Sequence, residues 1–214
     1  MRTYSAAEIT KMNIIAAAGN LAAADGFASV STRKVAEAAG ENIGSIHYHF
    51  GGKDGLFAAV VREAMSWCMD KEYFDAISAI DETATPKELA KVVRVIISSE
   101  ITDLFRTDRP AWHSQVIYQL LQRDDELYEL FRGEVLDPSM KALGRFLKII
   151  DPAMDETEVF QRTVTMKMPI FAHANYMKVF LKALGTESYT EEYLQKLEDL
   201  LVRQAQLSLG LPED

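Results

Sequence analysis

The apolar residues of this chain recur every three or four positions, which is the spacing of one face of an α-helix. This spacing is shown by Leu89, Val92/Val93, Ile96/Ile97 and Ile101. We find no convincing run in which apolar and polar residues alternate, as they would in a half-buried strand. The pattern therefore predicts an all-α protein.

Signals for helix ends divide this pattern into segments. Thr85 and Glu88 have the spacing of a capping box, and Pro86 between them suits the first helical position. The glycines that follow apolar runs, as residues that end helices do, are Gly26, Gly40, Gly185 and Gly210. The expected helices are approximately 6–24, 32–39, 43–49, 53–79, 86–105, 110–123, 125–149 (with a break at Pro138 as an alternative), 155–183 and 190–209.

The lengths of these segments change near residue 50. Short helices precede that point and long helices follow it. We therefore expect a small N-terminal domain at residues 1–52 and a larger helical domain at residues 53–214.

Composition narrows the class of protein. The 214 residues are 48% hydrophobic and 26% charged, which is ordinary for a soluble globular chain. The single cysteine, Cys68, cannot form an internal disulfide and fits a reducing compartment. No apolar run has the length of a signal peptide core or of a membrane span. We expect a soluble cytoplasmic protein without a membrane partner.

The net charge of −9 at first argues against a nucleic-acid partner, but its distribution changes that view. Residues 1–55 carry five basic and five acidic side chains, whereas the remaining residues carry 18 basic and 27 acidic ones. The N-terminal part could therefore lie against phosphates while the acidic remainder is kept away from them.

The segment SIHYHFGGKDGL, at residues 45–56, holds the most distinctive chemistry. His47 and His49 are two positions apart, about 200° around a helix, so they cannot bind one metal ion from the same helix. A phosphate-binding loop would need a glycine where His47 stands and Ser or Thr where Asp54 stands. We expect neither a metal site nor such a loop, and no cofactor.

The residues before this segment predict a first short helix. Ser31 or Thr32 would cap it, and Arg33 next to the free N–H groups of its first turn would favour an anion. Gly40 would end it.

The second short helix follows directly. Ile43, Ile46 and Phe50 are expected on its buried face. Its outward face would then carry the glycine, hydroxyl, imidazole and phenol groups of Gly44, Ser45, His47 and Tyr48. Two short helices, a glycine-containing turn and a polar second helix are typical of a helix-turn-helix.

Residues 26–56 resemble the N-terminal DNA-binding domain of the TetR family of transcriptional repressors. The resemblance rests on Gly26-Phe27, Ser31-Thr32, Val35-Ala36, Ala39-Gly40, Gly44, Ile46, Tyr48-His49-Phe50, Lys53 and Leu56. The sequence of residues 41–53 is also similar to that of the CecR-like branch of the family. The chain departs from the family pattern at Glu41 and His47, and the second departure affects which operator is recognised.

The resemblance implies roles by position. Ser31, Thr32, Tyr48 and Lys53 would hold phosphates, and Arg33 would reach a base or a phosphate. Two further side chains, Ser45 and His47, would contact bases, with Gly44 permitting the approach. His49 would either pack against the backbone of this domain or touch a phosphate.

The family resemblance also implies a body that binds a small molecule and a second subunit. The candidates for an adaptable apolar pocket are Met65, Trp67, Cys68, Trp112, Val116, Met166, Met168, Phe171 and His173. Each of them could instead be an ordinary core residue. Pro169 either opens a cavity beside this group or is a tolerated kink. The last two helices, 155–183 and 190–209, resemble a four-helix interface of a homodimer.

Together these features predict a ligand-responsive repressor that binds a pseudo-palindromic operator in double-stranded DNA as a homodimer. An apolar or amphiphilic small-molecule effector would release it. The alternatives are an all-α enzyme, for which no catalytic constellation is evident, and a helical adaptor without sequence-specific DNA binding.

Overall fold

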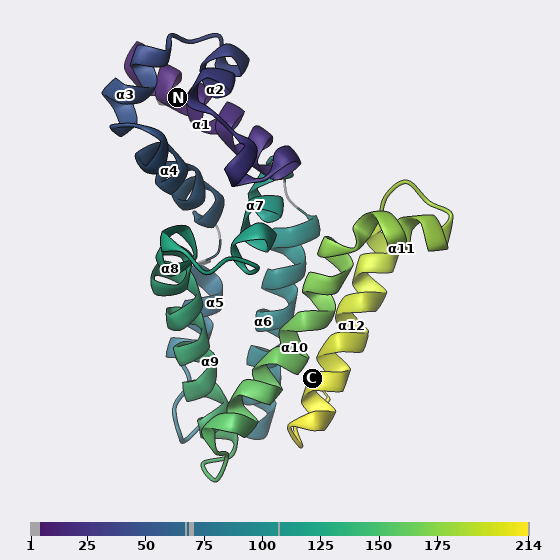
Figure 1. Cartoon of the computed structure of the whole chain (residues 1–214). Coiled ribbons are helices and arrows are strands. Elements are labelled where there is room, and N and C mark those ends of the chain that lie inside the picture. Colours follow the sequence, from purple (N-terminus) through teal and green to yellow (C-terminus); the bar gives the residue numbers. More distant parts are fainter. Residues whose placement is uncertain (1–4, 67, 69–70, 107, 214) are drawn as a thin grey trace. The chain divides into compact units, whose positions relative to one another are not determined.

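The computed structural model describes residues 5–66, 68, 71–106 and 108–213. Every regular element in this part of the chain is helical, so the predicted all-α fold is confirmed (Figure 1). The elements are α1 (Ala6–Asp25), η1 (Phe27–Ser29), α2 (Thr32–Ala39), α3 (Ile43–Phe50), α4 (Lys53–Met65), α5 (Lys71–Ser78), α6 (Pro86–Phe105), α7 (Trp112–Leu120), α8 (Glu126–Phe131), η2 (Arg132–Leu136), α9 (Asp137–Ile150), α10 (Glu156–Asn175), α11 (Met177–Leu184) and α12 (Glu191–Ser208).

The predicted helix-end signals are present. Thr85 Oγ1 accepts the N–H of Glu88 at 3.3 Å, and the Glu88 carboxylate accepts the N–H of Thr85 at 2.7 Å. This reciprocal pair satisfies two N–H groups that the first turn of α6 would leave unpaired. The four glycines predicted to end helices all have positive φ.

The helix predicted at 53–79 is divided in the structure. α4 ends at Met65 and α5 begins at Lys71. The Ser66 hydroxyl donates a hydrogen bond to the Glu63 carbonyl at 2.8 Å and so occupies one of the last acceptors of α4. The prediction of one continuous helix was wrong, because the apolar spacing continues past the point where α4 ends.

The helix predicted at 155–183 is also divided, but not at its proline. α10 runs through Pro169, and the division comes at Tyr176, before α11. His173 Nδ1 lies 2.8 Å from the Pro169 carbonyl oxygen, to which it donates, and Nε2 lies 3.0 Å from the Tyr193 hydroxyl. In the 125–149 segment, the π-helical turn η2 separates α8 from α9, whose first turn contains Pro138.

The chain forms two compact units. The first unit holds residues 1–67 and 109–135, and the second holds residues 68–108 and 136–214. All of residues 1–52 lie in the first unit, together with α4, α7 and α8. The boundary after residue 52 was predicted from expected function and stays a prediction, whereas this division reflects packing alone.

The core of the first unit is built around α1. This helix packs against α2, α4 and α7. Its buried face carries Ile14, Ile15, Ala18 and Ala22. Phe27, in η1, meets Phe57 of α4 edge to face, with ring centroids 5.1 Å apart. These contacts make the support on which α2 and α3 lie.

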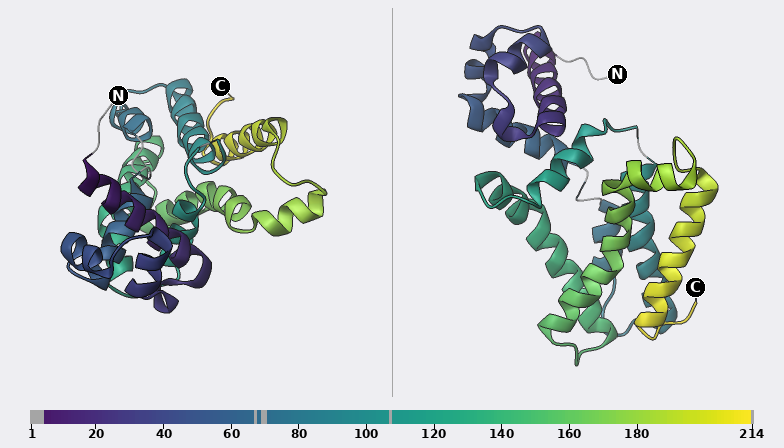
Figure 2. Two further views of the ribbon diagram at one scale, coloured as in Figure 1. Left: turned by 90° about the horizontal axis from the view of Figure 1, so that it is seen from above. Right: turned by 45° about the vertical axis from the view of Figure 1, so that its right-hand side comes forward.

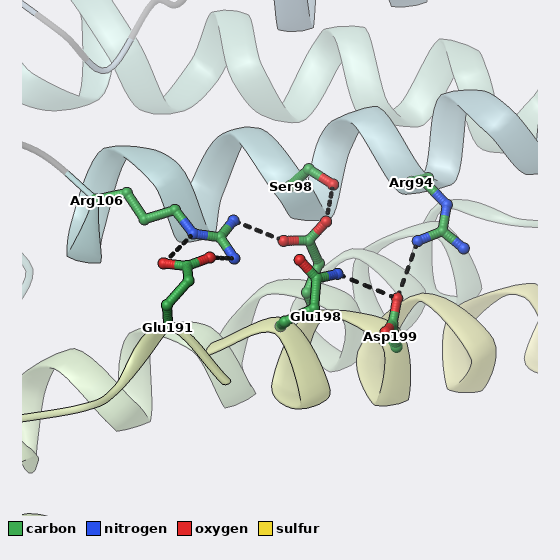
Figure 3. A network of polar contacts seen from close by, with 7 residues as sticks. Arg94, Ser98, Arg106, Glu191, Glu198 and Asp199 are labelled. Carbon is green, nitrogen blue, oxygen red and sulfur yellow. Dashed lines mark hydrogen bonds and ion pairs between the residues drawn. The ribbon is translucent and has the colours of Figure 1, made fainter. Parts of the chain in front are cut away.

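In the second unit, α6, α10 and α12 lie side by side (Figures 1 and 2). Their facing apolar side chains form one cluster, which includes Ile96, Ile97, Met166 and Leu201. A polar network also joins α6 to α12 (Figure 3).

The described residues include no helix with the length and apolar character of a membrane span.

Arg106 is the centre of that polar network. Its Nη1 donates to Glu198 at 2.8 Å and its Nη2 lies 2.7 Å from Glu191 (Figure 3). The carboxylates of Glu191 and Glu198 raise the pKa of the Arg106 guanidinium, against the opposing effect of burial. The Ser98 hydroxyl donates to the second oxygen of Glu198 at 2.6 Å. The buried carboxylate of Glu198 is thus held from both sides.

Candidate functional site

Local hydrogen bonds define both ends of α2. Ser31 Oγ accepts the N–H of Lys34 at 3.2 Å, so Ser31 is the cap of α2 and Thr32 is its first residue. At the other end, the N–H of Glu41 bonds to the Ala36 carbonyl at 2.9 Å, with Gly40 in the left-handed conformation. This Schellman motif fixes the direction in which the chain leaves α2.

α3 begins at a cap as well. Asn42 Oδ1 accepts the N–H of Gly44 at 2.8 Å. A Cβ atom on Gly44 would stand 3.2 Å from this oxygen, so the small residue leaves room for the cap. The structure therefore offers a local reason for glycine here, beside the predicted approach of a DNA backbone.

One side of α3 is buried and the other is open. Ile46 is fully buried, whereas His47 is exposed and Tyr48 is 84% exposed. Ser45 and His49 are half-buried, and the His49 ring meets the Tyr48 ring edge to face at 4.9 Å. The imidazole of His47 and the phenol of Tyr48 are thus available to a partner outside this unit.

Ile43 does not lie where the sequence indicated. It was expected on the buried face with Ile46 and Phe50, but its side chain is 45% exposed and Phe50 is only half-buried. The burial prediction for Ile43 was wrong. Periodicity places a residue on a face of a helix, but the first turn of α3 extends past the elements that cover its later residues.

The junction between α3 and α4 depends on a glycine that the sequence analysis missed. A Cβ atom on Gly55 would stand 1.9 Å from the Phe50 carbonyl oxygen. The first turn of α4 therefore packs directly against the end of α3. Lys53, in that turn, is exposed, and its Nζ lies 5.4 Å from the centre of the Phe57 ring. The contact holds Lys53 close to the end of α3.

The basic side chains at the start of α2 differ in their surroundings. Lys34 Nζ forms an ion pair with Asp25 at 3.0 Å, and both groups are largely exposed. Arg33 is exposed and has no ion-pair partner within the described residues. Arg33 is therefore the better placed of the two to meet a phosphate.

α7 and the residues that follow it contact α1 and η1, just before the helix-turn-helix segment, which sequence reasoning did not anticipate. Gln119 Nε2 donates to the Ala22 and Ala23 carbonyls, at 2.9 and 3.1 Å, near the end of α1. The guanidinium of Arg123 lies over the Phe27 ring, 5.1 Å from its centre. The Gln119 side chain of α7 thus caps the end of α1, which lies about 100 residues earlier in the chain.

The predicted pocket residues are divided between the two units. Met65, Trp112 and Val116 are buried in the first unit. The others in the described part of the chain belong to the second unit: Cys68 (half-buried), Met166 (buried), Met168 (45% exposed), Phe171 (half-buried) and His173 (half-buried). Trp67 lies outside the described residues. Neither unit therefore contains all of the residues that were predicted to line one pocket.

Several grooves are present on the units. One of about 500 Å³ lies along α10 and α12, and Met166 is the predicted residue that lines it, beside Arg162 and Leu201. Another of about 480 Å³ lies in the first unit beside Lys53, Phe57 and Arg123. Among the residues that the structure describes, no three His, Cys, Asp or Glu side chains gather as a metal site would require.

Comparison with known proteins agrees with this geometry. Residues 14–60, which contain α2, the turn and α3, match the model of bacterial regulatory proteins of the tetR family. HlyIIR, a hemolysin II transcriptional regulator, has a TM-score of 0.64 at 14% identity, over 98% of this chain and 100% of that chain. The fatty acid degradation regulator FadR from Bacillus halodurans has a TM-score of 0.63 at 18% identity, over 99% and 100%.

A third structure is that of SmeT in complex with triclosan, with a TM-score of 0.61 at 13% identity over 93% of this chain and 90% of that chain. At such identities the likeness shows the fold. No curated protein matches the sequence. None of these comparisons confirms the CecR-like branch. Residues 14–60 therefore match the bacterial regulatory proteins of the tetR family, and the chain as a whole shares the fold of transcriptional regulators of known structure.

Proposed function

We propose that this protein is a ligand-responsive repressor that binds a pseudo-palindromic operator as a homodimer and leaves it when a small-molecule effector binds. The observation that carries the proposal is the open face of α3, where Tyr48 is 84% exposed beside an exposed His47. The exposed phenol of Tyr48 can still bury apolar surface and form hydrogen bonds with a partner. A short helix with such a face fits the major groove of DNA.

The basic side chains near α3 also support DNA as the partner. Lys53 and Arg33 are exposed at the starts of α4 and α2. The first-turn N–H groups of α2 add a partial positive charge beside Ser31 and Thr32. In the proposal these residues hold phosphates together with Tyr48, while Ser45 and His47 contact bases. Residues 1–52 then bind DNA, and residues 53–214 bind the effector and the second subunit.

Exposed apolar side chains on the last helices support a dimer. Phe160 and Met168 lie two turns apart on α10 and are 57% and 45% exposed. Leu200 and Leu207 lie two turns apart on α12 and are 64% and 59% exposed. Such rows are costly to leave in water and suit helix-on-helix packing between two subunits. A twofold dimer would present two copies of α3 to two half-sites.

The proposal of an effector is supported by the SmeT structure, which holds triclosan, an apolar small molecule, in the same fold. The predicted pocket residues remain the candidates for contact with an apolar or amphiphilic effector. An effector can release DNA only through its different affinities for the DNA-binding and released conformations.

Selection of bound fragments from random DNA, with the purified full-length protein, tests the central claim. We expect a pseudo-palindromic consensus. Substitution of Tyr48 by Ala should weaken binding to it, and Lys53→Ala should also reduce the slope of log affinity against log salt by about 0.9 per lost phosphate contact. Tyr176→Ala is the matched control, because Tyr176 is also exposed, at 55%, but lies in the second unit.

The contrary result is equally clear. If no sequence is enriched and both variants bind DNA like the parent, the chain is an adaptor and the DNA-binding proposal fails.

Sedimentation tests the dimer separately: Phe160→Lys combined with Leu200→Lys should give monomers, whereas Ile9→Lys should not. Thermal shift against apolar and cationic amphiphilic compounds tests the effector, and no stabilisation by any of them would contradict that part of the proposal.

A further inference from the structure

Ile43 is an apolar side chain in an unexpected place. It is the first residue of α3 and is 45% exposed, although the neighbouring open face carries His47 and Tyr48. Ile43 and His47 are one turn apart and therefore share a face of the helix. Within this face, Ile43 has neither a donor nor an acceptor to offer.

Capping of α3 does not explain the isoleucine, and packing covers only part of it, since 45% of the residue stays exposed. The helix begins at Asn42, whose side chain accepts the Gly44 N–H at 2.8 Å without any help from residue 43. The core contact of α3 comes from Ile46, which is fully buried. A polar residue at position 43 would serve the cap equally well, and the exposed part of this side chain offers an apolar surface at the first position of α3.

We propose that Ile43 determines operator specificity by contacting the C5-methyl group of a thymine. This inference rests on the proposed function, in which α3 enters the major groove. The N-terminal residues of a recognition helix are the ones that meet base edges. On those edges, the thymine methyl is the apolar group that the major groove presents. Ile43 therefore selects thymine at one position of each half-site, while His47 contacts a neighbouring base by hydrogen bonding.

Removal of single methyl groups from the DNA tests the proposed contact of Ile43 directly. The operator obtained by selection is synthesised with each thymine in turn replaced by deoxyuridine, which lacks only the methyl group. We expect one thymine per half-site at which this change weakens binding about fourfold, the value of one buried methyl. The same measurements are then made with Ile43→Ala.

Ile43→Ala should bind the thymine operator more weakly and should no longer distinguish thymine from deoxyuridine at that position. The loss of coupling, rather than the loss of affinity, is the decisive readout. Ile9→Ala is the control, because Ile9 is 49% exposed and lies on α1 of the same unit. Ile9→Ala should keep the discrimination, and thermal unfolding should show that Ile43→Ala is folded.

The outcomes separate this inference from the proposed function. If an operator is selected but no deoxyuridine weakens binding, or if the discrimination persists in Ile43→Ala, the assignment of Ile43 is overturned while DNA binding stands. If no operator is selected at all, the proposed function itself has failed.

Discussion

The indole ring of Trp112 lies directly against the backbone of Gly19. A Cβ atom on Gly19 would stand 2.4 Å from Cε3 of this ring, and Trp112 is itself buried. α7 therefore packs on α1 at a distance that only glycine permits. With the hydrogen bonds from Gln119 to the end of α1, this contact makes α7 part of the unit that carries α3.

Gly19→Ala should destabilise the protein. In an ordinary helix the change would be favourable, but here the new methyl group overlaps the Trp112 ring, and we expect a loss of about 2 kcal/mol in the free energy of unfolding. Denaturant titration measures it. Gly133→Ala is the control, because a Cβ atom there meets nothing within 4 Å.

A second variant tests the cause of that loss. Trp112→Leu should make the Gly19→Ala change much less costly, because the smaller side chain leaves space for the methyl group. Equal costs in the two backgrounds would show that Trp112 is not the obstacle.

Gly55→Ala should disturb DNA binding more than any other glycine-to-alanine change within a helix. The new Cβ atom would stand 1.9 Å from the Phe50 carbonyl oxygen, so α4 and α3 must separate and Lys53 must shift relative to Tyr48. We expect at least a tenfold loss of operator affinity, about 1.4 kcal/mol. Gly144→Ala, whose Cβ atom would make an ordinary 3.4 Å contact in α9, should bind DNA normally. Normal binding by Gly55→Ala would refute this account of the junction.

Glu198→Ala should destabilise the second unit through Arg106. The Glu198 side chain is 8% exposed, and its removal leaves the guanidinium of Arg106 partly buried with one carboxylate fewer. We expect a loss of about 2 kcal/mol, below the cost for a fully buried pair because Arg106 keeps some contact with water. Glu192→Ala breaks the fully exposed pair with Lys196 and should cost less than about 0.5 kcal/mol. Similar costs for the two variants would contradict the importance of burial.

His113 should make the protein less stable in mild acid. Burial lowers the pKa of its imidazole below the ordinary value of 6.5, with Glu63 opposing this shift and Arg109 adding to it. The unfolded chain therefore takes up this proton first, and the free energy of unfolding falls as the pH drops below about 6.5. His113→Leu should show a smaller loss between about pH 7.5 and 5.5. An unchanged pH dependence would assign the effect to other groups.

Much of the helix-turn-helix segment could be predicted because its signals are local. Gly40 and the predicted cap at Ser31 or Thr32 bracket α2, and the observed limits, Thr32–Ala39, are those expected from the sequence. The exposure of Ile43 could not be predicted, because it depends on which elements cover the start of α3. The division of the 53–79 segment was missed because apolar spacing continues across it, although α4 ends at Met65 and α5 begins at Lys71.

By itself, the sequence determined the all-α class, several capped helix ends and the positions of α2 and α3. Those features depend on hydrogen bonds and apolar spacing within a few residues. Only the tertiary structure decided that α7 packs on α1 and that Gly19 and Gly55 are positions of close contact. The physical reason is that these contacts join surfaces whose meeting depends on the path of the whole chain, which no local pattern encodes.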